Sequence, residues 1–290
     1  MPEISPALYR AGEGAPLVLL HGFTATWRCW LPNLAELVPR FEVIAPTLHG
    51  HDGGPALPEG ARAKSLSDAG DHVEQQLDEL GVGEAHFAGN SMGGALALEL
   101  AKRGRARSVV ALSPGGGWEE GDRKEVERII RLFKRTQKSA RATVKHHERL
   151  LARPGFRRIG MRDIMARGHL VPAEEAVLMT RSSIRCSVVE DVFKTMRDGT
   201  GRVVDLDQMR APTLIAWGEK DRLLPMDRHA ERFRTEIPGV EFRVLRGLGH
   251  TPMWDDPGQI AETIGDFATA AQAAGNGQAA SVTTGAGASG

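Results

Sequence analysis

A serine flanked by glycines is the residue of this chain best placed to act as a nucleophile. Ser91 lies in Gly89-Asn90-Ser91-Met92-Gly93-Gly94, directly after the apolar run 85–88. Such a serine can occupy a tight turn from a strand into a helix, with its hydroxyl exposed. The residues two before and two after it must be small, because larger side chains would collide across the bend. The pattern is short, so its meaning depends on whether the chain also supplies a base, an acid and an oxyanion site.

His250 and Asp221 are the candidates for the base and the acid. His250 lies in Gly247-Leu248-Gly249-His250-Thr251-Pro252, after the apolar run 242–245. A serine hydroxyl is a poor nucleophile until a neighbouring imidazole removes its proton in the transition state. Asp221 follows the run 213–217, and a carboxylate there can fix the imidazole tautomer and stabilise the imidazolium.

Two backbone amides are candidates for the oxyanion hole. Phe23 belongs to His21-Gly22-Phe23, a loop that follows the apolar run 17–20 and can aim its N–H at the substrate oxygen. Together with the Met92 N–H it would form a two-donor site, each donor contributing about 3 kcal/mol in the transition state. We expect His21 to shape this loop and not to act as an acid or a base.

Strands and helices alternate around these residues. β-rich runs followed by helical periodicity predict a parallel sheet covered by helices on both faces, an α/β fold. The chemically important residues all follow predicted strands, and ligand crevices form at the carboxyl edge of such sheets. The predicted strands are 17–20, 42–45, 85–88, 108–112, 213–217 and 242–245, and the predicted helices are 27–38, 66–80, 92–102, 227–235 and 257–270.

The composition changes in the middle of the chain and again at its end. After Pro114-Gly115-Gly116-Gly117 the strand signal gives way to helical, strongly charged sequence, and strands return at 213. We therefore expect a core formed by 1–116 and 205–272, with residues 117–204 as a helical insertion. Residues 273–290 are mostly Gly, Ala, Ser and Thr and are expected to be a disordered tail.

The joint pattern resembles the α/β-hydrolase fold superfamily over about residues 7–272. The order Ser91, Asp221, His250 matches the Ser…Asp…His order of that fold, and the insertion stands where the family carries its helical cap. We call residues 117–204 the cap. The resemblance implies a mostly parallel central sheet, a Ser91–His250–Asp221 triad, and catalysis without a cofactor or a metal ion.

Two local alternatives remain open. Glu219, Asp227, Asp255 and Asp256 are carboxylates near Asp221 that could replace it as the acid. The loop 46–54 departs from the aspartate-and-glycine pattern usual in relatives, because it carries Thr47, His49 and Asp52. His49, His51 and Asp52 could be imagined as metal ligands, but two histidines at this spacing in a glycine loop lack supporting ligands. A structural or solvated loop is the favoured interpretation.

The predicted function is hydrolysis of a small or medium ester, thioester or lactone through an acyl-enzyme. The elbow around Ser91 is also similar to that of carbon–carbon bond hydrolases, although those relatives usually carry Trp where this chain has Thr251. Perhydrolase activity would be a side reaction of the same site. Epoxide hydrolases and haloalkane dehalogenases use an aspartate nucleophile, which Ser91 argues against. A non-catalytic ligand receptor on the same fold is the rival from another class.

Bulk properties exclude few partners. Acidic and basic residues balance at 37 each, so net charge gives no argument for nucleic acid. Cys29 and Cys186 match no metal or redox spacing, and the chain shows neither a signal peptide nor an apolar run long enough to span a membrane. We expect a cytoplasmic protein with a small-molecule substrate; the oligomeric state is left open.

One stretch of the cap is strongly basic. Residues 128–145 contain seven basic residues, no acidic residue and a partial apolar stripe. This segment is either a solvated helix or a basic surface that attracts an anionic substrate or touches an anionic surface.

Overall fold

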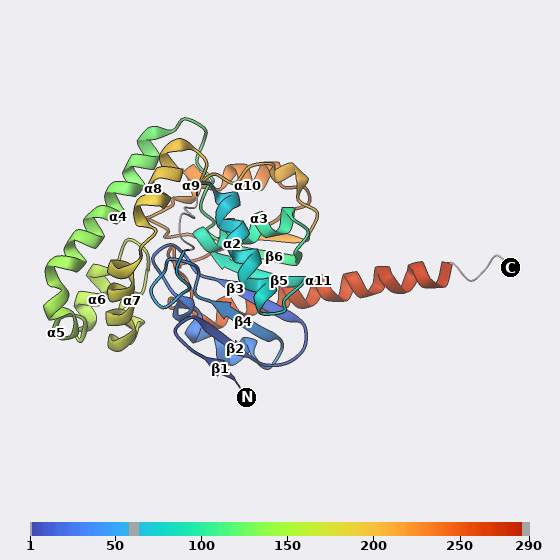
Figure 1. The fold of residues 1–290 in the computed structure, drawn as a ribbon, viewed down its shortest axis with the longest axis horizontal. Coiled ribbons are helices and arrows are strands. Elements are labelled where there is room, and N and C mark those ends of the chain that lie inside the picture. Colours follow the sequence, from blue (N-terminus) through green and yellow to red (C-terminus); the bar gives the residue numbers. More distant parts are fainter. Residues whose placement is uncertain (1, 58–63, 286–290) are drawn as a thin grey trace.

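A sheet of eight strands, in the order β1-β2-β4-β3-β5-β6-β7-β8, forms the centre of the molecule (Figure 1). The computed structural model describes residues 2–57 and 64–285, with side-chain surroundings up to residue 275. β1 and β2 pair antiparallel and β3 to β8 pair parallel, so the expected α/β fold with a mostly parallel sheet is confirmed. The strands are β1 (Glu3–Ile4), β2 (Leu8–Ala11), β3 (Pro16–Leu20), β4 (Glu42–Pro46), β5 (Ala85–Asn90), β6 (Ala106–Leu112), β7 (Thr213–Gly218) and β8 (Glu241–Leu245).

Helices cover both faces of the sheet, which explains why its central strands are buried along most of their length and largely apolar. Alternate residues of β3 enter opposite cores: Val18 and Leu20 pack in one, Leu17 and Leu19 in the other. The first core includes α2 (Leu66–Glu79) and α3 (Met92–Lys102). The second includes the 3-10 helix η1 (Trp27–Asn33), α1 (Leu34–Leu37) and α11 (Pro257–Gly285).

The cap helices lie between β6 and β7 and form a separate layer to one side of the sheet (Figure 1). The two ends of the cap meet, because the Val203 amide donates to the Gly116 carbonyl at 3.1 Å. The helices are α4 (Arg123–Thr143), α5 (His147–Leu151), α6 (Pro154–Gly160), α7 (Ala173–Arg185) and α8 (Val189–Asp198), with 3-10 turns η2 (Val144–His146) and η3 (Gly168–Leu170).

Several elements differ from the sequence-based expectation. The helix expected over 27–38 begins as η1, with Pro32 inside it, and becomes α-helical only at Leu34. The helix expected over 227–235 is divided into α9 (Met226–His229) and α10 (Glu231–Glu236), and η4 (Leu206–Gln208) precedes β7. α11 continues through 273–285, where a disordered tail was expected, and residues 286–290 of that predicted tail lie outside the described part of the chain.

In the described part of the chain, we find no helix with the length and apolar character needed to cross a bilayer.

Candidate active site

Ser91 occupies the strained turn that its flanking glycines predict. It joins β5 to α3 with φ 57° and ψ −117°, a conformation rare for a residue with a side chain. A Cβ on Gly89 would lie 2.1 Å from the Gly93 carbonyl oxygen, and one on Gly93 would lie 2.1 Å from the Leu20 carbonyl oxygen. The backbone at both positions is therefore packed too closely for any residue larger than glycine.

Asp221 and His250 are brought together from loops after β7 and β8. His250 Nδ1 lies 2.7 Å from Asp221 Oδ2, and both side chains are buried. The other carboxylate oxygen of Asp221 accepts the Leu224 amide at 2.8 Å. His250 Nε2 is buried and has no hydrogen-bond partner among the described residues, and the residue His250 lines a pocket that Ser91 also lines. This nitrogen is left available for a proton from a group in the pocket.

Three of the four alternative carboxylates accept backbone amides of their own. Glu219 accepts the Gly247 amide at 2.8 Å, and Asp256 caps α11 by accepting the Gln259 amide at 3.1 Å. Asp255 is buried and accepts the amide of Gly249 at 2.8 Å. None of these three contacts the His250 ring in the described structure, so the geometry favours Asp221 as its partner.

Asp255 also ties the histidine loop to the cap, a role that sequence reasoning missed. Its carboxylate accepts the amides of Ala166 and Arg167 at 2.9 and 2.6 Å, in addition to that of Gly249. The Thr251 amide, next to His250, donates to the Ile164 carbonyl at 2.7 Å. The loop that carries the histidine is thus held by the cap segment 164–167.

Asn90 is a second positioning residue that sequence reasoning did not single out. Its Nδ2 donates to the Leu112 carbonyl at 3.1 Å and to the His250 carbonyl at 2.8 Å. The residue before the candidate nucleophile therefore anchors the backbone of the candidate base. The motif shows Asn90 only as a variable position, and its partner lies 160 residues away.

Phe23 and Met92 lie beside Ser91, as the oxyanion prediction requires. Met92 is the first residue of α3, where a backbone N–H has no acceptor within its own helix. A Cβ on Gly22 would lie 3.4 Å from the Ser91 Cβ, so the loop that carries Phe23 passes directly over the serine. Their role as oxyanion donors stays a prediction.

Neutral histidines shape the neighbouring loop. His21 Nε2 accepts the Leu48 amide at 2.9 Å, and Nδ1 donates to the Gly22 carbonyl at 2.8 Å. Burial, and then the nearby His51, lower the pKa of His21 well below its ordinary value. Burial also lowers the pKa of His51 to about 4. Among the described residues no three His, Cys, Asp or Glu side chains cluster as a metal site would need.

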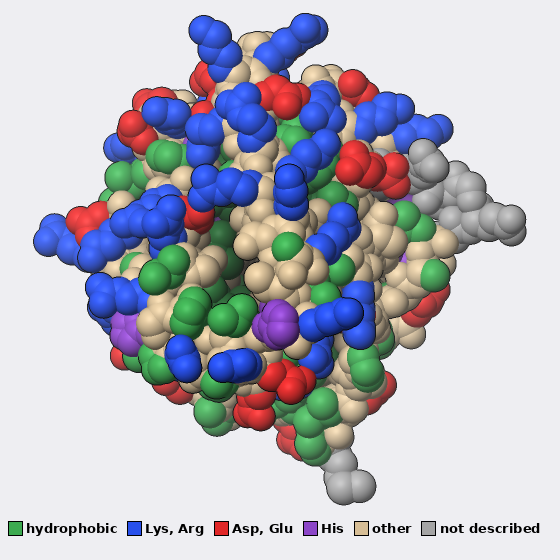
Figure 2. All heavy atoms as spheres, turned by 90° about the vertical axis from the view of Figure 1, so that its left-hand side faces the viewer, with side chains coloured by type: hydrophobic (Ala, Val, Ile, Leu, Met, Phe, Trp, Pro, Cys, Tyr) green, Lys and Arg blue, Asp and Glu red, His purple; other side chains and the backbone are tan. Residues whose placement is uncertain are grey.

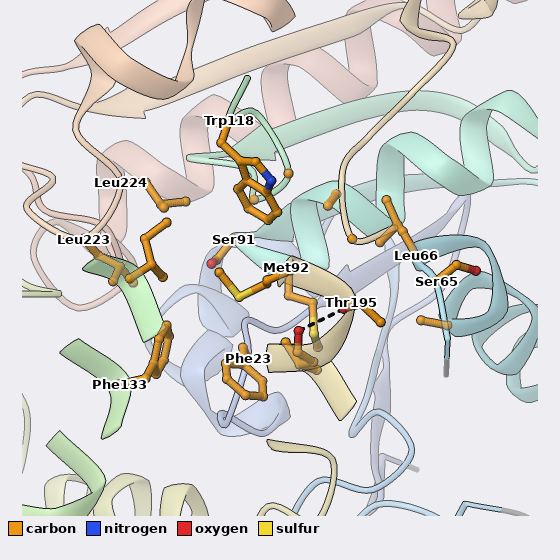
Figure 3. Close-up of a pocket in the computed structure, with 18 residues that line it drawn as sticks. Phe23, Ser65, Leu66, Ser91, Met92, Trp118, Phe133, Thr195, Leu223 and Leu224 are labelled. Atoms are coloured by element: carbon orange, nitrogen blue, oxygen red, sulfur yellow. Dashed lines mark hydrogen bonds between the residues drawn. The ribbon is translucent and has the colours of Figure 1, made fainter. Parts of the chain in front are cut away.

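Two pockets meet at Ser91, and Phe23, Phe133 and Leu223 line both of them. The first, of about 100 Å³, is almost entirely apolar and lies against α3 and α8 (Figure 3). In that view Ser91 lies between Trp118 and Leu224 on one side and Met92 and Phe23 on the other. The other apolar side chains that line this first pocket include Leu66, Ala95, Ile129, Val192 and Met196.

The second pocket, of about 170 Å³, contains His250 and is more polar. Hydroxyl and amide groups reach it from the Phe23 loop and from the cap helices. These polar lining residues are Thr24, Thr26, Asn90, Thr136, Gln137, Thr180, Ser182, Ser183 and Thr251.

The elbow serine, the paired histidine and aspartate, and the cap over a parallel sheet place this molecule in the class of α/β-fold hydrolases. Its sequence bears this out: residues 17–263 match the profile of the alpha/beta hydrolase family, and the chain belongs to that family.

Named relatives within the family differ in the reaction that their names describe. The chain is 34% identical to epoxide hydrolase EphH of Mycobacterium tuberculosis over 68% of its own length and 92% of the relative's. It is 27% identical to the 2-hydroxy-6-oxo-6-phenylhexa-2,4-dienoate hydrolase of Burkholderia cepacia, over 89% and 88% of the two chains. A solved structure of Est816, described as an N-acyl homoserine lactone degrading enzyme, superposes with a TM-score of 0.66 at 26% identity, over 88% and 94%.

Proposed function

We propose that this protein hydrolyses a carboxylic ester, thioester or lactone through a serine acyl-enzyme. The observation that carries the proposal is the state of His250. Asp221 holds its Nδ1, Asn90 holds its backbone, and its Nε2 has no hydrogen-bond partner among the described residues, while His250 and Ser91 line the same pocket. An imidazole held in this way is prepared to exchange a proton with a group in that pocket.

The proposed mechanism uses each of these groups once per half-reaction. Ser91 Oγ attacks the carbonyl carbon while His250 Nε2 takes its proton, and the Phe23 and Met92 amides bind the oxyanion. When the tetrahedral intermediate collapses, the bond to the leaving group breaks and His250 Nε2 returns the proton to it. Water, deprotonated by the same nitrogen, then attacks the acyl-enzyme. When this second intermediate collapses, the bond to Ser91 Oγ breaks, His250 Nε2 returns the proton to that oxygen, and the acid is released. Asp221 holds the Nδ1–H and stabilises the imidazolium throughout.

The two pockets suggest how the substrate is oriented. The leaving group must receive its proton from His250 Nε2, so it belongs in the larger and more polar of the two pockets, which His250 lines. The acyl group then extends into the apolar pocket beside Met92 and Trp118. An apolar acyl chain joined to a polar leaving group fits this arrangement. The Est816 relative, described as degrading an N-acyl homoserine lactone, offers a precedent of that shape.

Carbon–carbon bond hydrolysis is the second candidate, because the Burkholderia cepacia relative is named for a dienoate substrate. We rank this reaction below ester hydrolysis, because such hydrolases usually carry Trp directly after the catalytic histidine and this chain carries Thr251. Epoxide opening ranks lower still, despite the EphH name of one relative, since a carboxylate nucleophile is expected for that reaction and this elbow presents the Ser91 hydroxyl.

The decisive experiment combines covalent labelling with a substrate panel. A fluorophosphonate probe should label the wild-type chain stoichiometrically, and Ser91→Ala should abolish labelling and lower kcat on nitrophenyl esters about a million-fold. Ser183→Ala is the matched control, because Ser183 lines the same pocket and its hydroxyl donates only to the Thr180 carbonyl in the described contacts.

Each outcome separates the candidates. A loss of only a few-fold in Ser91→Ala would mean that the nucleophile is misassigned. Labelling without turnover of any ester, together with cleavage of a vinylogous diketone, would favour carbon–carbon bond hydrolysis. A chain that the probe does not label and that turns over no ester, diketone or epoxide, but binds a small molecule, would favour a ligand receptor. Turnover of a styrene-type epoxide by Ser91→Ala would favour epoxide opening.

A further inference from the structure

The outer surface of the cap exposes hydrophobic side chains that no described element covers. Eight large hydrophobic residues are exposed in the described chain, and five of them lie between residues 144 and 178. Phe156 and Ile159 on α6 are 44% and 66% exposed, and Leu170 on η3 is 52% exposed. α6 and η3 pack together, with Arg157 Nη2 donating to the His169 carbonyl at 3.2 Å. These three side chains therefore belong to one region of the surface.

The part of the cap that leads to α6 and η3 is strongly basic. Residues 128–167 carry 13 basic and two acidic side chains. Two of the basic ones point inward: Arg128 pairs with Glu125, and Arg157 is buried and donates to the Leu151 and Ala152 carbonyls. The others are exposed (Arg131, Lys134, Arg135, Lys138, Arg141, Lys145, Arg149, Arg153, Arg158, Arg162 and Arg167).

We call these exposed basic residues, together with Val144, Phe156, Ile159 and Leu170, the cap face. Figure 2 views the molecule from this side and shows Lys and Arg side chains spread across it, with hydrophobic side chains among them.

The combination of charges and exposed apolar groups narrows the choice of partner. Arginines and lysines alone would suit any polyanion, and a small anion would not cover Phe156 or Ile159. An anionic bilayer matches both kinds of side chain, because its phosphates attract the basic ones while its acyl region accepts the apolar ones. We propose that the cap face docks on an anionic lipid bilayer, with Phe156, Ile159 and Leu170 inserted among the headgroups.

Docking in this way would bring the candidate active site close to the lipid. Gly160 and Met161 follow Ile159 directly in the chain, and both line the pocket that contains Ser91 and His250. The membrane proposal does not depend on the reaction at that site, since its test measures binding alone.

The test is sedimentation of the full chain with phosphatidylcholine vesicles, with and without about 30% phosphatidylglycerol, at near-physiological salt. Two cap-face variants, Arg153→Glu/Arg158→Glu and Phe156→Ser/Ile159→Ser, alter exposed side chains and should keep the fold, which circular dichroism verifies. Their controls lie on the core: Arg107→Glu/Arg210→Glu changes two exposed arginines, and Ile4→Ser changes an exposed apolar residue.

Wild type and both controls should bind anionic vesicles and not neutral ones. Charge reversal at Arg153 and Arg158 should weaken binding about thirtyfold or more, since each basic residue near an anionic leaflet contributes about fivefold. The serine variants should weaken it about tenfold. Equal sedimentation with neutral and anionic vesicles, or wild-type binding by both cap-face variants, would overturn the proposal. So would retention of a duplex DNA by a chain that ignores vesicles, which would make the surface a general polyanion site.

Discussion

At the residue scale, the candidate site depends on close backbone packing as much as on its reactive side chains. The Ser91 turn exists because Gly89 and Gly93 let three chain segments approach within contact distance. The reactive residues could be predicted from the sequence, because each one follows an apolar strand in a recognisable motif. Their catalytic roles stay predictions until activity is measured.

Gly93→Ala should destabilise the protein by about 3 kcal/mol, because the new methyl group would meet the immobile Leu20 carbonyl oxygen. Urea unfolding measures the change. Gly83→Ala is the matched control, since no atom lies within 4 Å of a Cβ there and its φ is not positive. Equal stabilities of the two variants would show that the elbow can relax.

His51 should make the fold sensitive to acid. Burial lowers its pKa from 6.5 to about 4, so between these values the folded state binds fewer protons than the unfolded state. The His51 contribution is therefore complete above about pH 6.5 and is lost as the pH falls toward 4, by up to about 3 kcal/mol. His51→Asn should remove this part of the pH dependence in chemical unfolding measured from pH 7 to 4. Parallel profiles for the wild type and the variant would contradict the assignment.

At the element scale, the contacts that hold the histidine loop come from distant parts of the chain. Asn90 reaches it from the end of β5, and Asp255 joins it to the cap segment 164–167. Neither role could be predicted from the sequence, because each depends on tertiary contacts between segments separated by 88 to 160 residues. The central strands were predictable, since burial on both faces gives each of them an apolar run. β1 and β2 were not, because they are short, lie at the edge of the sheet and lack such a run.

Asp255→Asn should lower kcat at least about tenfold and cost about 3 kcal/mol in stability, because an amide cannot accept all three backbone N–H groups. Steady-state kinetics and urea unfolding measure the two effects. Asp266→Asn, at an exposed position of α11 that pairs with Arg40, should change neither. A variant with full activity would show that the cap does not position His250.

At the scale of the whole molecule, the cap is net basic and the rest of the chain is net acidic, although the net charge of the whole is zero. The cap carries 20 basic and 12 acidic residues, so the remainder carries 17 basic and 25 acidic residues. A composition summed over the whole chain cancels this asymmetry, which becomes visible only when the cap is considered by itself. The fold class, the parallel sheet and the family were all predictable, because they follow from the alternation of strands and helices and from the order of the motifs.

Truncation after Gly275 should leave stability within about 0.5 kcal/mol of the full chain and leave activity unchanged. Among the side chains of α11 that are described, up to residue 275, the last buried one is Ala268, and residues 272–275 are exposed. The end of this helix projects away from the sheet (Figure 1). Thermal unfolding and ester turnover of the truncated chain provide the check, and a loss above about 1 kcal/mol would show that the end of α11 packs against the core.

The hydrogen bond between Val203 and Gly116 has a consequence for how such a protein can be altered. The chain leaves the core at one strand, β6, and re-enters it at the neighbouring strand, β7, through two segments that touch. A foreign helical segment whose own ends meet can therefore be grafted at this junction without moving a strand. Such a graft must also supply the amides and the carbonyl that the cap segment 164–167 offers to the histidine loop, because that loop is held from the cap as well as from the core.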